Sequence, residues 1–239
     1  MVKRGLGVGF LLLAFGLFGT GPFLTGLVKQ QLTRTLIAEA RVAEGVDLTM
    51  APLRLGDLMN GRVGAVDFAA ARLGFAGGPV FTNVALRSKG GRFDVGALLW
   101  RGEFILRELA ETHVRLELVE EELTALMRRD LPELEPTVSL KEGLVEVEGF
   151  LDLFGRRRLP FSASASLEKA SGRSLRLAPL GLKVAGVALW SELFNQYAPQ
   201  LSWEFPLEIP WPVRLERFKV ALGAIHMEWR EERSEEHTS

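Results

Sequence analysis

The chain has 239 residues, of which 47% are hydrophobic and 25% are charged, a composition typical of a globular protein. Lys and Arg together number 29 and Asp and Glu 30, so the formal net charge at pH 7 is −1, which argues against a nucleic-acid-binding protein because such proteins carry a basic surface. The sequence contains no cysteine, which excludes disulfide bonds, thiolate nucleophiles and a lipid-modified cysteine.

The chain opens with an uncharged segment, Gly5–Val28, that follows the basic residues Lys3 and Arg4. The segment is rich in Leu and Phe and is longer than the roughly 20 apolar residues that span a membrane. Basic flanking residues favour the cytoplasm, so the rest of the chain is expected on the opposite side. A secretory signal sequence shares the basic start and the apolar middle, but no clear Ala-x-Ala cleavage site follows. We therefore expect residues 1–28 to be a transmembrane anchor, with a cleaved signal sequence and a buried helix as alternatives.

Residues 29–45 continue with apolar side chains near helical spacing, among them Leu32, Leu36 and Ala40. Charged residues fall mostly between these positions. This pattern predicts a juxtamembrane helix that ends near Gly45.

Residues 46–232 are expected to form one α+β domain, because no Pro- or Ser-rich linker divides them. Alternating apolar and polar residues between closely spaced turn signals predict a mostly antiparallel sheet. The expected extended segments are Val46–Met50, Arg62–Ala71, Val80–Ser88, Phe104–Leu118, Val138–Leu153, Arg157–Leu167, Leu175–Leu177, and a final hairpin of Val213–Leu222 and Ala224–Arg230.

Three short helices are expected within this domain. Asp94 is placed to cap the first, Val95–Trp100. The second, Glu120–Leu131, has acidic residues in its first turn and basic residues in its last turn, which suits the helix dipole, and Pro132 ends it. The third is Leu189–Ala198, which has an apolar face.

The last residues of the chain, Arg233–Ser239, read RSEEHTS. This string resembles the translation of a common sequencing-library adapter, and such scars lie outside the folded domain. The alternative is a charged, disordered tail. We expect an artefact, so we assign no role to His237.

Motifs that would indicate an enzyme are missing from the sequence, which has no GxSxG, HExxH, Walker loop or GxGxxG between a strand and a helix. The acidic run Glu120–Glu122 suits a solvated helix N-terminus better than a metal site. His113 and His226 lie on the polar side of expected strands and have no visible acid–base partner, so we interpret them as surface residues. We therefore expect no enzyme activity, no metal and no cofactor.

Two features of the domain suit contact with lipid. The tip of one expected hairpin combines aromatic and basic side chains, which favour an anionic membrane surface. The tip residues are Phe154, Arg156, Arg157 and Arg158. A solvated turn whose charges prevent edge pairing is the alternative. The second feature is a set of bulky apolar residues that either line a lipid cleft or fill an ordinary core. These residues are Leu123, Leu126, Met127, Phe150, Phe161, Trp190 and Phe194.

In this order of elements the chain resembles the LmeA-like phospholipid-binding family, which consists of bacterial cell-envelope proteins. The resemblance extends over about Leu32–Trp229, and its strength comes from the order of four segments. The segments are VRLELVEEELTALM (Val114–Met127), VSLKEGLVEVEGFL (Val138–Leu151), SLRLAPLGLKVAGVAL (Ser174–Leu189) and LEIPWPVRLERFKVALGAIHMEW (Leu207–Trp229).

The resemblance implies a curved, mostly antiparallel β-sheet that wraps one or two helices and leaves an apolar cleft, as in a TULIP-like half-barrel. It also implies that the protein binds phospholipid or a similar lipid, in lipid transfer or envelope maintenance. Together with the apolar start, it places the domain outside the bacterial cytoplasmic membrane on a single span. It implies no catalytic residues. The alternative is a structural module of the envelope with a filled core and a protein partner, and a lipid or glycan hydrolase is a third reading.

Overall fold

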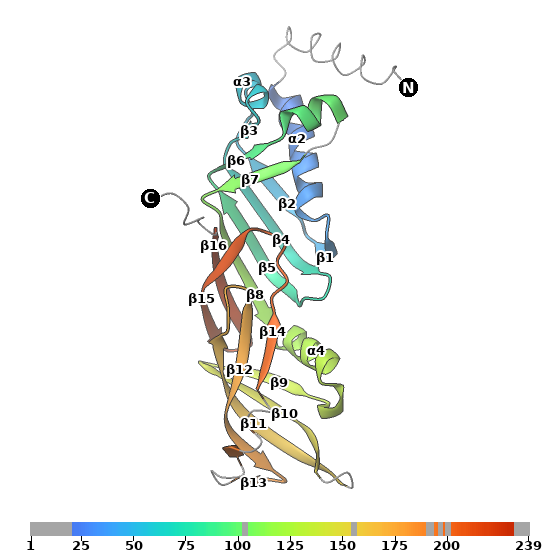
Figure 1. Cartoon of the computed structure of the whole chain (residues 1–239), viewed down its shortest axis with the longest axis vertical. Coiled ribbons are helices and arrows are strands. Elements are labelled where there is room, and N and C mark those ends of the chain that lie inside the picture. Colours follow the sequence, from blue (N-terminus) through green and yellow to red (C-terminus); the bar gives the residue numbers. More distant parts are fainter. Residues whose placement is uncertain are drawn as a thin grey trace, which may run out of the picture.

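The computed structural model describes residues 21–101, 105–153, 157–189, 194–195, 198 and 202–231. Three antiparallel sheets follow one another along the axis of an elongated molecule (Figure 1). Most of the expected anchor, residues 1–20, and the expected artefact Arg233–Ser239 lie outside the described residues.

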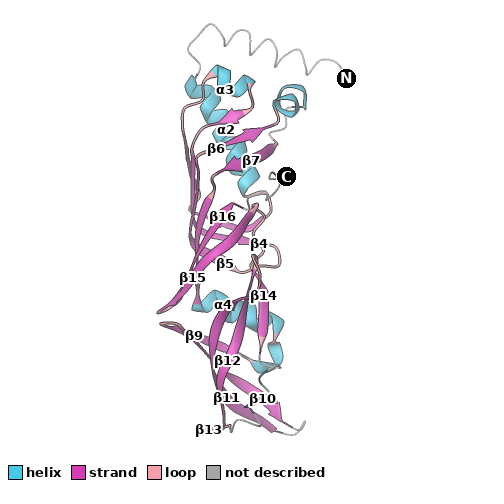
Figure 2. Ribbon diagram, turned by 60° about the vertical axis from the view of Figure 1, so that its left-hand side comes forward, coloured by secondary structure: helices cyan, strands magenta, loops and turns pink. Residues whose placement is uncertain are grey.

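A seven-stranded sheet forms the middle of the molecule. Its strands are β1 (Ala40–Glu44), β4 (Val66–Phe75), β5 (Val80–Ser88), β8 (His113–Val119), β16 (Ala224–Glu231) and β15 (Val213–Ala221) in spatial order, and β2 (Asp47–Met50) also pairs with β4. Apolar residues alternate along β4, β8 and β16, so one face of the sheet is buried. Helix α2 (Gly21–Leu36) lies along this sheet (Figure 2) and buries Val28, Leu32 and Leu36, which are spaced four residues apart.

A small sheet closes one end of the molecule. Its strands are β3 (Arg62–Val63), β6 (Gly90–Phe93) and β7 (Leu106–Ala110), and it lies beside helix α3 (Leu55–Met59) and a short π-helix, η1 (Ala97–Arg101). Gly61 joins α3 to β3 with φ of +62°, and a Cβ there would lie 2.4 Å from the carbonyl oxygen of Phe93. Only glycine allows this turn and this close approach.

A six-stranded sheet forms the opposite end. Its strands are β13 (Val187–Ala188), β12 (Ser174–Val184), β11 (Arg157–Lys169), β10 (Leu144–Leu153) and β9 (Thr137–Lys141), and β14 (Trp203–Pro206) also pairs with β12. Helix α4 (Glu120–Asp130) and the 3₁₀-helix η2 (Pro132–Leu134) lie on one side of it. We call the face under α4 the inner face and the opposite face the outer face.

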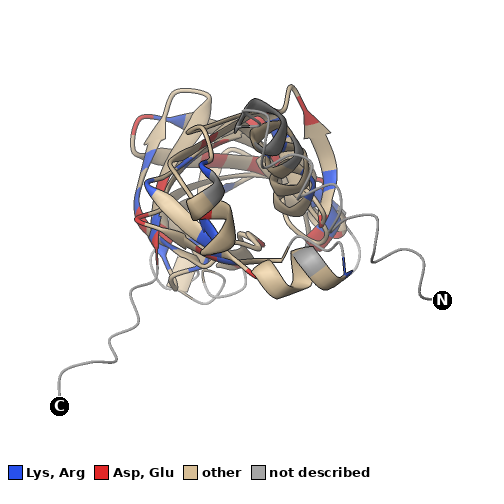
Figure 3. Cartoon of the chain, turned by 90° about the horizontal axis from the view of Figure 1, so that it is seen from above, with Lys and Arg blue, Asp and Glu red and all other residues tan. Residues whose placement is uncertain are grey.

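Backbone hydrogen bonds between hairpin turns join the seven-stranded sheet to the six-stranded sheet. Gly143 N–H donates to Val220 O (3.1 Å) and Gly223 N–H donates to Leu140 O (3.2 Å), so the β9–β10 turn meets the β15–β16 turn. A single cluster of buried apolar side chains continues from one sheet to the other. Seen along the long axis (Figure 3), acidic and basic residues both occur around the outside, in keeping with the near-zero net charge.

The mostly antiparallel α+β architecture predicted from the sequence is confirmed. The described strands form three open sheets rather than one curved sheet, and none of these sheets closes into a barrel. The helix predicted for residues 29–45 ends at Leu36, because Ala40–Glu44 pair with β4 instead of continuing the helix. None of the helices among the described residues is long and apolar enough to cross a membrane.

Candidate functional site

Helix α4 covers the inner face of the six-stranded sheet with the stripe predicted from the sequence. Leu123, Leu126 and Met127 are all buried, with exposed fractions of 0%, 4% and 4%. On the sheet, Phe161 is also buried, and it joins Met127 in the lining of one apolar pocket. The structure therefore brings together four of the predicted cleft residues around the interface of α4 and the sheet.

The pocket at this interface is small. Its volume is about 20 Å³, which is room for about one water molecule. The short side chains of Ala163 and Ala165 form its floor on β11, and Leu134 of η2 closes it from above. Leu134 can approach because Gly149 lies beneath it, where a Cβ would come within 2.4 Å of the Leu134 carbonyl oxygen. The inner face is thus nearly filled by the protein's own side chains.

The polar side of α4 is bonded to the edge strand β9. The Glu120 carboxylate accepts the Leu140 N–H (2.5 Å), the Thr124 hydroxyl accepts the Val138 N–H (3.0 Å), and Arg128 Nε donates to Pro136 O (2.8 Å). These three side chains are four residues apart and form one row on the helix. The row supplies hydrogen-bond partners to backbone groups at the free edge of β9, as a neighbouring strand would. It also holds α4 over the inner face.

Glu122 connects α4 to the middle sheet. Its Oε1 accepts a hydrogen bond from Arg72 Nη2 at 2.8 Å, while Arg72 Nη1 contacts Glu44 at 3.4 Å. The hydrogen bond with Glu122 and the charge of Glu44 raise the pKa of the Arg72 guanidinium above its ordinary value. The acidic start of α4, which we expected to be only solvated, therefore makes specific contacts through Glu120 and Glu122.

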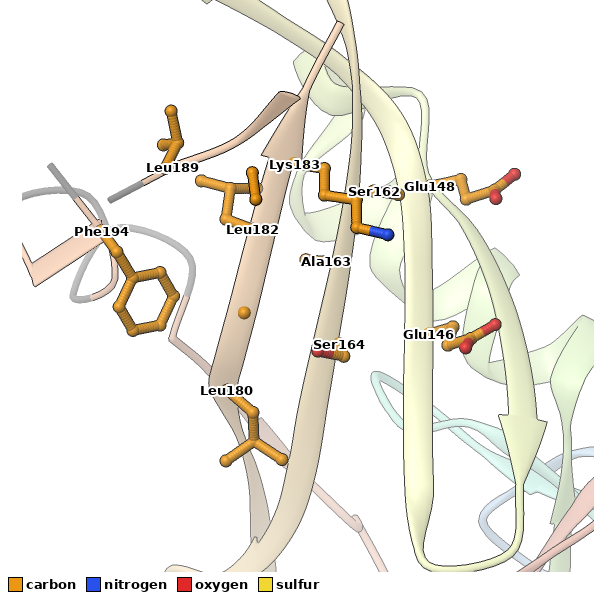
Figure 4. A pocket seen from close by; sticks show the side chains of 12 residues that line it. Glu146, Glu148, Ser162, Ala163, Ser164, Leu180, Leu182, Lys183, Leu189 and Phe194 are labelled. Carbon is orange, nitrogen blue, oxygen red and sulfur yellow. The ribbon is translucent and has the colours of Figure 1, made fainter. Parts of the chain in front are cut away.

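A larger groove, of about 650 Å³, lies against the outer face around β11 and β12. Lys183 pairs with Ser162 and Ser162 pairs with Glu148, so these three side chains form a polar row across three strands (Figure 4). A second row contains Ser164 and Glu146.

The other side of this outer groove is apolar. It is formed by Leu180, Leu189 and Phe194, and Figure 4 shows them on the side away from Glu146 and Glu148. Leu180 is 59% exposed, so its side chain is available to a ligand. The groove is therefore amphipathic. The sequence analysis identified Phe194 but missed the polar row, although the alternating Ser162, Ser164 and Ser166 opposite a lysine were a usable signal.

Phe150 does not line the pocket under α4. Gly149 pairs directly with Phe161, so Phe150 faces the opposite side of the sheet, where it is 39% exposed. The Arg158 guanidinium stacks over its ring at 5.2 Å and pairs with Glu135 at 3.0 Å. Phe150 is thus absent from the pocket under α4, although Phe150 and Phe161 both line another pocket of about 400 Å³.

The remaining predicted site residues are only partly described. Trp190, Phe154 and Arg156 lie outside the described residues, and Arg157 is described in its backbone alone. Arg158 is exposed near the β10–β11 hairpin tip. The ends of β10 and β11 that flank the tip lie at the end of the molecule opposite the start of α2 (Figure 1).

The histidines of the middle sheet differ from each other in their surroundings. Both are exposed, but His226 Nδ1 lies 3.1 Å from Glu117 Oε1, so His226 has an acidic partner that the sequence did not reveal. Among the residues that the structure describes, no group of His, Asp and Glu is arranged to hold a metal ion.

Comparison with known proteins gives one match. The family model described as LmeA-like phospholipid-binding matches residues 19–229, which is most of the chain. No curated protein and no solved structure matches the chain. The match covers α2, all three sheets and α4, and on this evidence the chain belongs to the LmeA-like phospholipid-binding family.

Proposed function

We propose that this protein binds a phospholipid or a similar lipid in the outer groove of the six-stranded sheet. Membership of a phospholipid-binding family supports lipid as the ligand. The observation that carries the location is the amphipathic groove of about 650 Å³, with Leu180, Leu189 and Phe194 facing a row of polar side chains. An amphipathic ligand matches both sides at once.

The size of the two cavities favours the groove over the inner pocket. Ligand sites usually measure about 300–1,000 Å³, and the groove falls in this range. The pocket under α4, at about 20 Å³, would admit an acyl chain only if α4 moved away from β9. The hydrogen bonds of Glu120, Thr124 and Arg128 oppose such a movement.

The polar row offers complementary charges to a lipid headgroup. The Lys183 ammonium suits a phosphate, and the Glu148 carboxylate suits an ammonium group. Ser162 lies between them and has a hydroxyl for a hydrogen bond. Apolar contact of the acyl chain would supply most of the binding free energy, at about 0.8 kcal/mol per buried methylene.

We also propose that the protein is held at the outer surface of a bacterial cytoplasmic membrane by its N-terminal segment, and that it acts as a binding protein rather than an enzyme. The uncharged run Gly5–Val28 behind Lys3 and Arg4 supports this location. Transfer of lipid or maintenance of the envelope would then be its role.

The test of the groove is the amount of phospholipid that copurifies with the full chain. Leu180→Glu should lower the bound lipid about tenfold or more, because burying a leucine is worth roughly 1.5–3 kcal/mol. Leu222→Glu is the matched control, since Leu222 is 81% exposed at the distant β15–β16 turn. Equal lipid in both variants would reject the groove, and a parent protein without lipid would reject lipid binding itself.

A structural module of the envelope with a protein partner remains the second candidate. The nearly filled inner face, with its pocket of about 20 Å³, favours it, because a lipid carrier needs space for its ligand. The same purification separates the two functions: a lipid-free parent that retains a stoichiometric protein would support the module.

A further inference from the structure

Three large apolar side chains are exposed at the end of the molecule that carries the small sheet. Trp100 is 88% exposed, Met59 60% and Ile105 39%. By contrast, Trp203, Trp211 and Trp229 are at most 7% exposed. Exposed apolar residues that cluster mark an interaction surface more often than single ones do.

Hydrogen bonds bring the segments with these side chains together. Phe93 N–H donates to Gly61 O (2.8 Å), which joins the end of β6 to the turn after Met59. Asp94 N–H donates to Ile105 O (2.9 Å), which joins the start of η1 to the start of β7. Figures 1 and 2 both show α3 and η1 at this end. We call the surface of Met59, Trp100 and Ile105 the apolar end.

The uncharged N-terminal run enters the structure at the same end. Helix α2 begins at Gly21 beside α3 (Figure 1), and the Thr25 hydroxyl in its second turn accepts the Leu53 N–H at 3.1 Å. Leu53 lies just before α3, which ends at Met59. Residues 5–20, which precede α2, contain no charged side chain. The uncharged N-terminal run therefore joins the domain at the end that carries Met59, Trp100 and Ile105.

Two exposed arginines lie side by side next to the apolar end. Arg62 and Arg92 are directly paired across β3 and β6. Two like charges in one cross-strand pair disfavour each other, and anionic groups would relieve this.

We propose that the apolar end docks on the surface of a lipid membrane, with Trp100 at the level of the headgroups. Tryptophan favours this interface, and arginine favours anionic headgroups. The molecule would then stand with its long axis away from the membrane and the lipid groove at the far end. This inference does not depend on the groove, because it rests on different residues at the opposite end.

The test uses tryptophan fluorescence of the full chain in vesicles of phosphatidylcholine and phosphatidylglycerol. Trp100 is isolated as the difference between the parent and Trp100→Phe, so signals from the other tryptophans cancel. Brominated acyl chains should quench this difference signal roughly twofold or more, because an interfacial indole contacts the lipid. Iodide in the aqueous phase should quench the Trp100 signal less in the vesicle-bound chain than in the unbound chain in detergent-free solution.

Leu222→Trp in the Trp100→Phe background is the matched control, because it places an exposed tryptophan at the β15–β16 turn. Its fluorescence should respond to iodide and not to brominated lipid. The proposal is overturned if iodide quenches Trp100 in the vesicle-bound protein as strongly as in the unbound protein. It is equally overturned if Trp100 is shielded from iodide without quenching by brominated lipid, which indicates a protein contact, or if the chain does not float with vesicles. None of these outcomes changes the amount of lipid that copurifies with the chain, so the lipid site in the groove is tested independently.

Discussion

Side-chain size determines how much space lies under helix α4. Ala163 and Ala165 have short side chains on the inner face, yet between them and Met127 there is a volume of only about 20 Å³. The large residues around this site, Leu123, Leu126 and Phe161, are at most 4% exposed. At the scale of single residues, the interface between α4 and the sheet is thus packed, with one small gap.

Replacing Leu126 with Trp should therefore destabilise the domain rather than only exclude a lipid. Overpacking a well-packed core costs about 1–3 kcal/mol, which thermal unfolding of the full chain would detect. Ala125→Trp is the control, because Ala125 is exposed on the same helix. An unchanged unfolding temperature for Leu126→Trp would show that the inner face holds a real cleft.

The sequence predicted the burial of most site residues but not the location of the groove. The helical stripe of Leu123, Leu126 and Met127 was sufficient to predict their buried positions. The alternation along β10 also contained the position of Phe150, which shares the phase of Glu146 and Glu148 rather than that of Val147. The polar row depends on the register of three strands, and register depends on pairing that one strand alone does not encode.

At the scale of elements, α4 takes the place of a further strand beside β9, at the edge of the six-stranded sheet. Its row of Glu120, Thr124 and Arg128 bonds to backbone groups of β9 at two-residue intervals, from Leu140 to Pro136. An uncovered edge strand invites pairing with other chains. The helix thereby blocks the edge while its apolar stripe covers the inner face.

Removing one bond of this row should loosen α4 locally. Thr124→Val keeps the side-chain shape but leaves the Val138 N–H without its acceptor, which costs about 1–2 kcal/mol. Hydrogen exchange of the Val138 amide should accelerate, and Thr124→Ser should restore its protection. Identical exchange in the valine variant and the parent would show that the hydroxyl does not hold the helix.

The helical turn that presents Trp100 should be sensitive to acid. Asp94 Oδ2 accepts a hydrogen bond from Arg107 (2.6 Å) and Oδ1 accepts the Ala97 N–H (2.9 Å), and these bonds lower the pKa of Asp94. Because the pKa in the folded state lies below the unfolded value of about 3.9, the stabilisation is complete above that value and is lost as the pH falls through the folded pKa.

Amide exchange of Ala97, corrected for its intrinsic rate, should therefore accelerate below about pH 4. Asp94→Asn removes the titrating group, so its exchange should no longer depend on acid in this range. A parent protein whose Ala97 amide is equally protected at pH 6 and pH 3 would contradict the role of Asp94.

At the scale of the whole molecule, the described segments next to two predicted membrane contacts, the N-terminal anchor and the basic hairpin tip, lie at opposite ends. Helix α2 starts at one end, and the ends of β10 and β11 that flank the tip lie at the other (Figure 1). The order of strands along the sequence did not reveal this separation. Division into three sheets depends on contacts between distant segments, such as the pairing of β8 with β16, which local alternation does not report.

A membrane contact of the tip should consequently involve a second membrane. When the full chain is anchored in neutral vesicles, added anionic vesicles should cluster with them. Replacing Arg156, Arg157 and Arg158 with Ser should reduce this clustering. Higher salt should weaken it in the parent, because exposed charges are screened over about 8–10 Å near physiological ionic strength. Arg217→Ser is a control on exposed β15. Equal clustering by the triple variant would remove the tip from any role at a membrane.

The most direct measurement of the central proposal is photocrosslinking of the full chain to a phospholipid with a photoreactive group in its acyl chain. Peptide mapping by mass spectrometry should place crosslinks on the groove, at Leu180 and Leu189 around β12, and Leu180→Glu should remove them. Crosslinks confined to the uncharged N-terminal run and the apolar end, with none on β12, would contradict a lipid site in the groove.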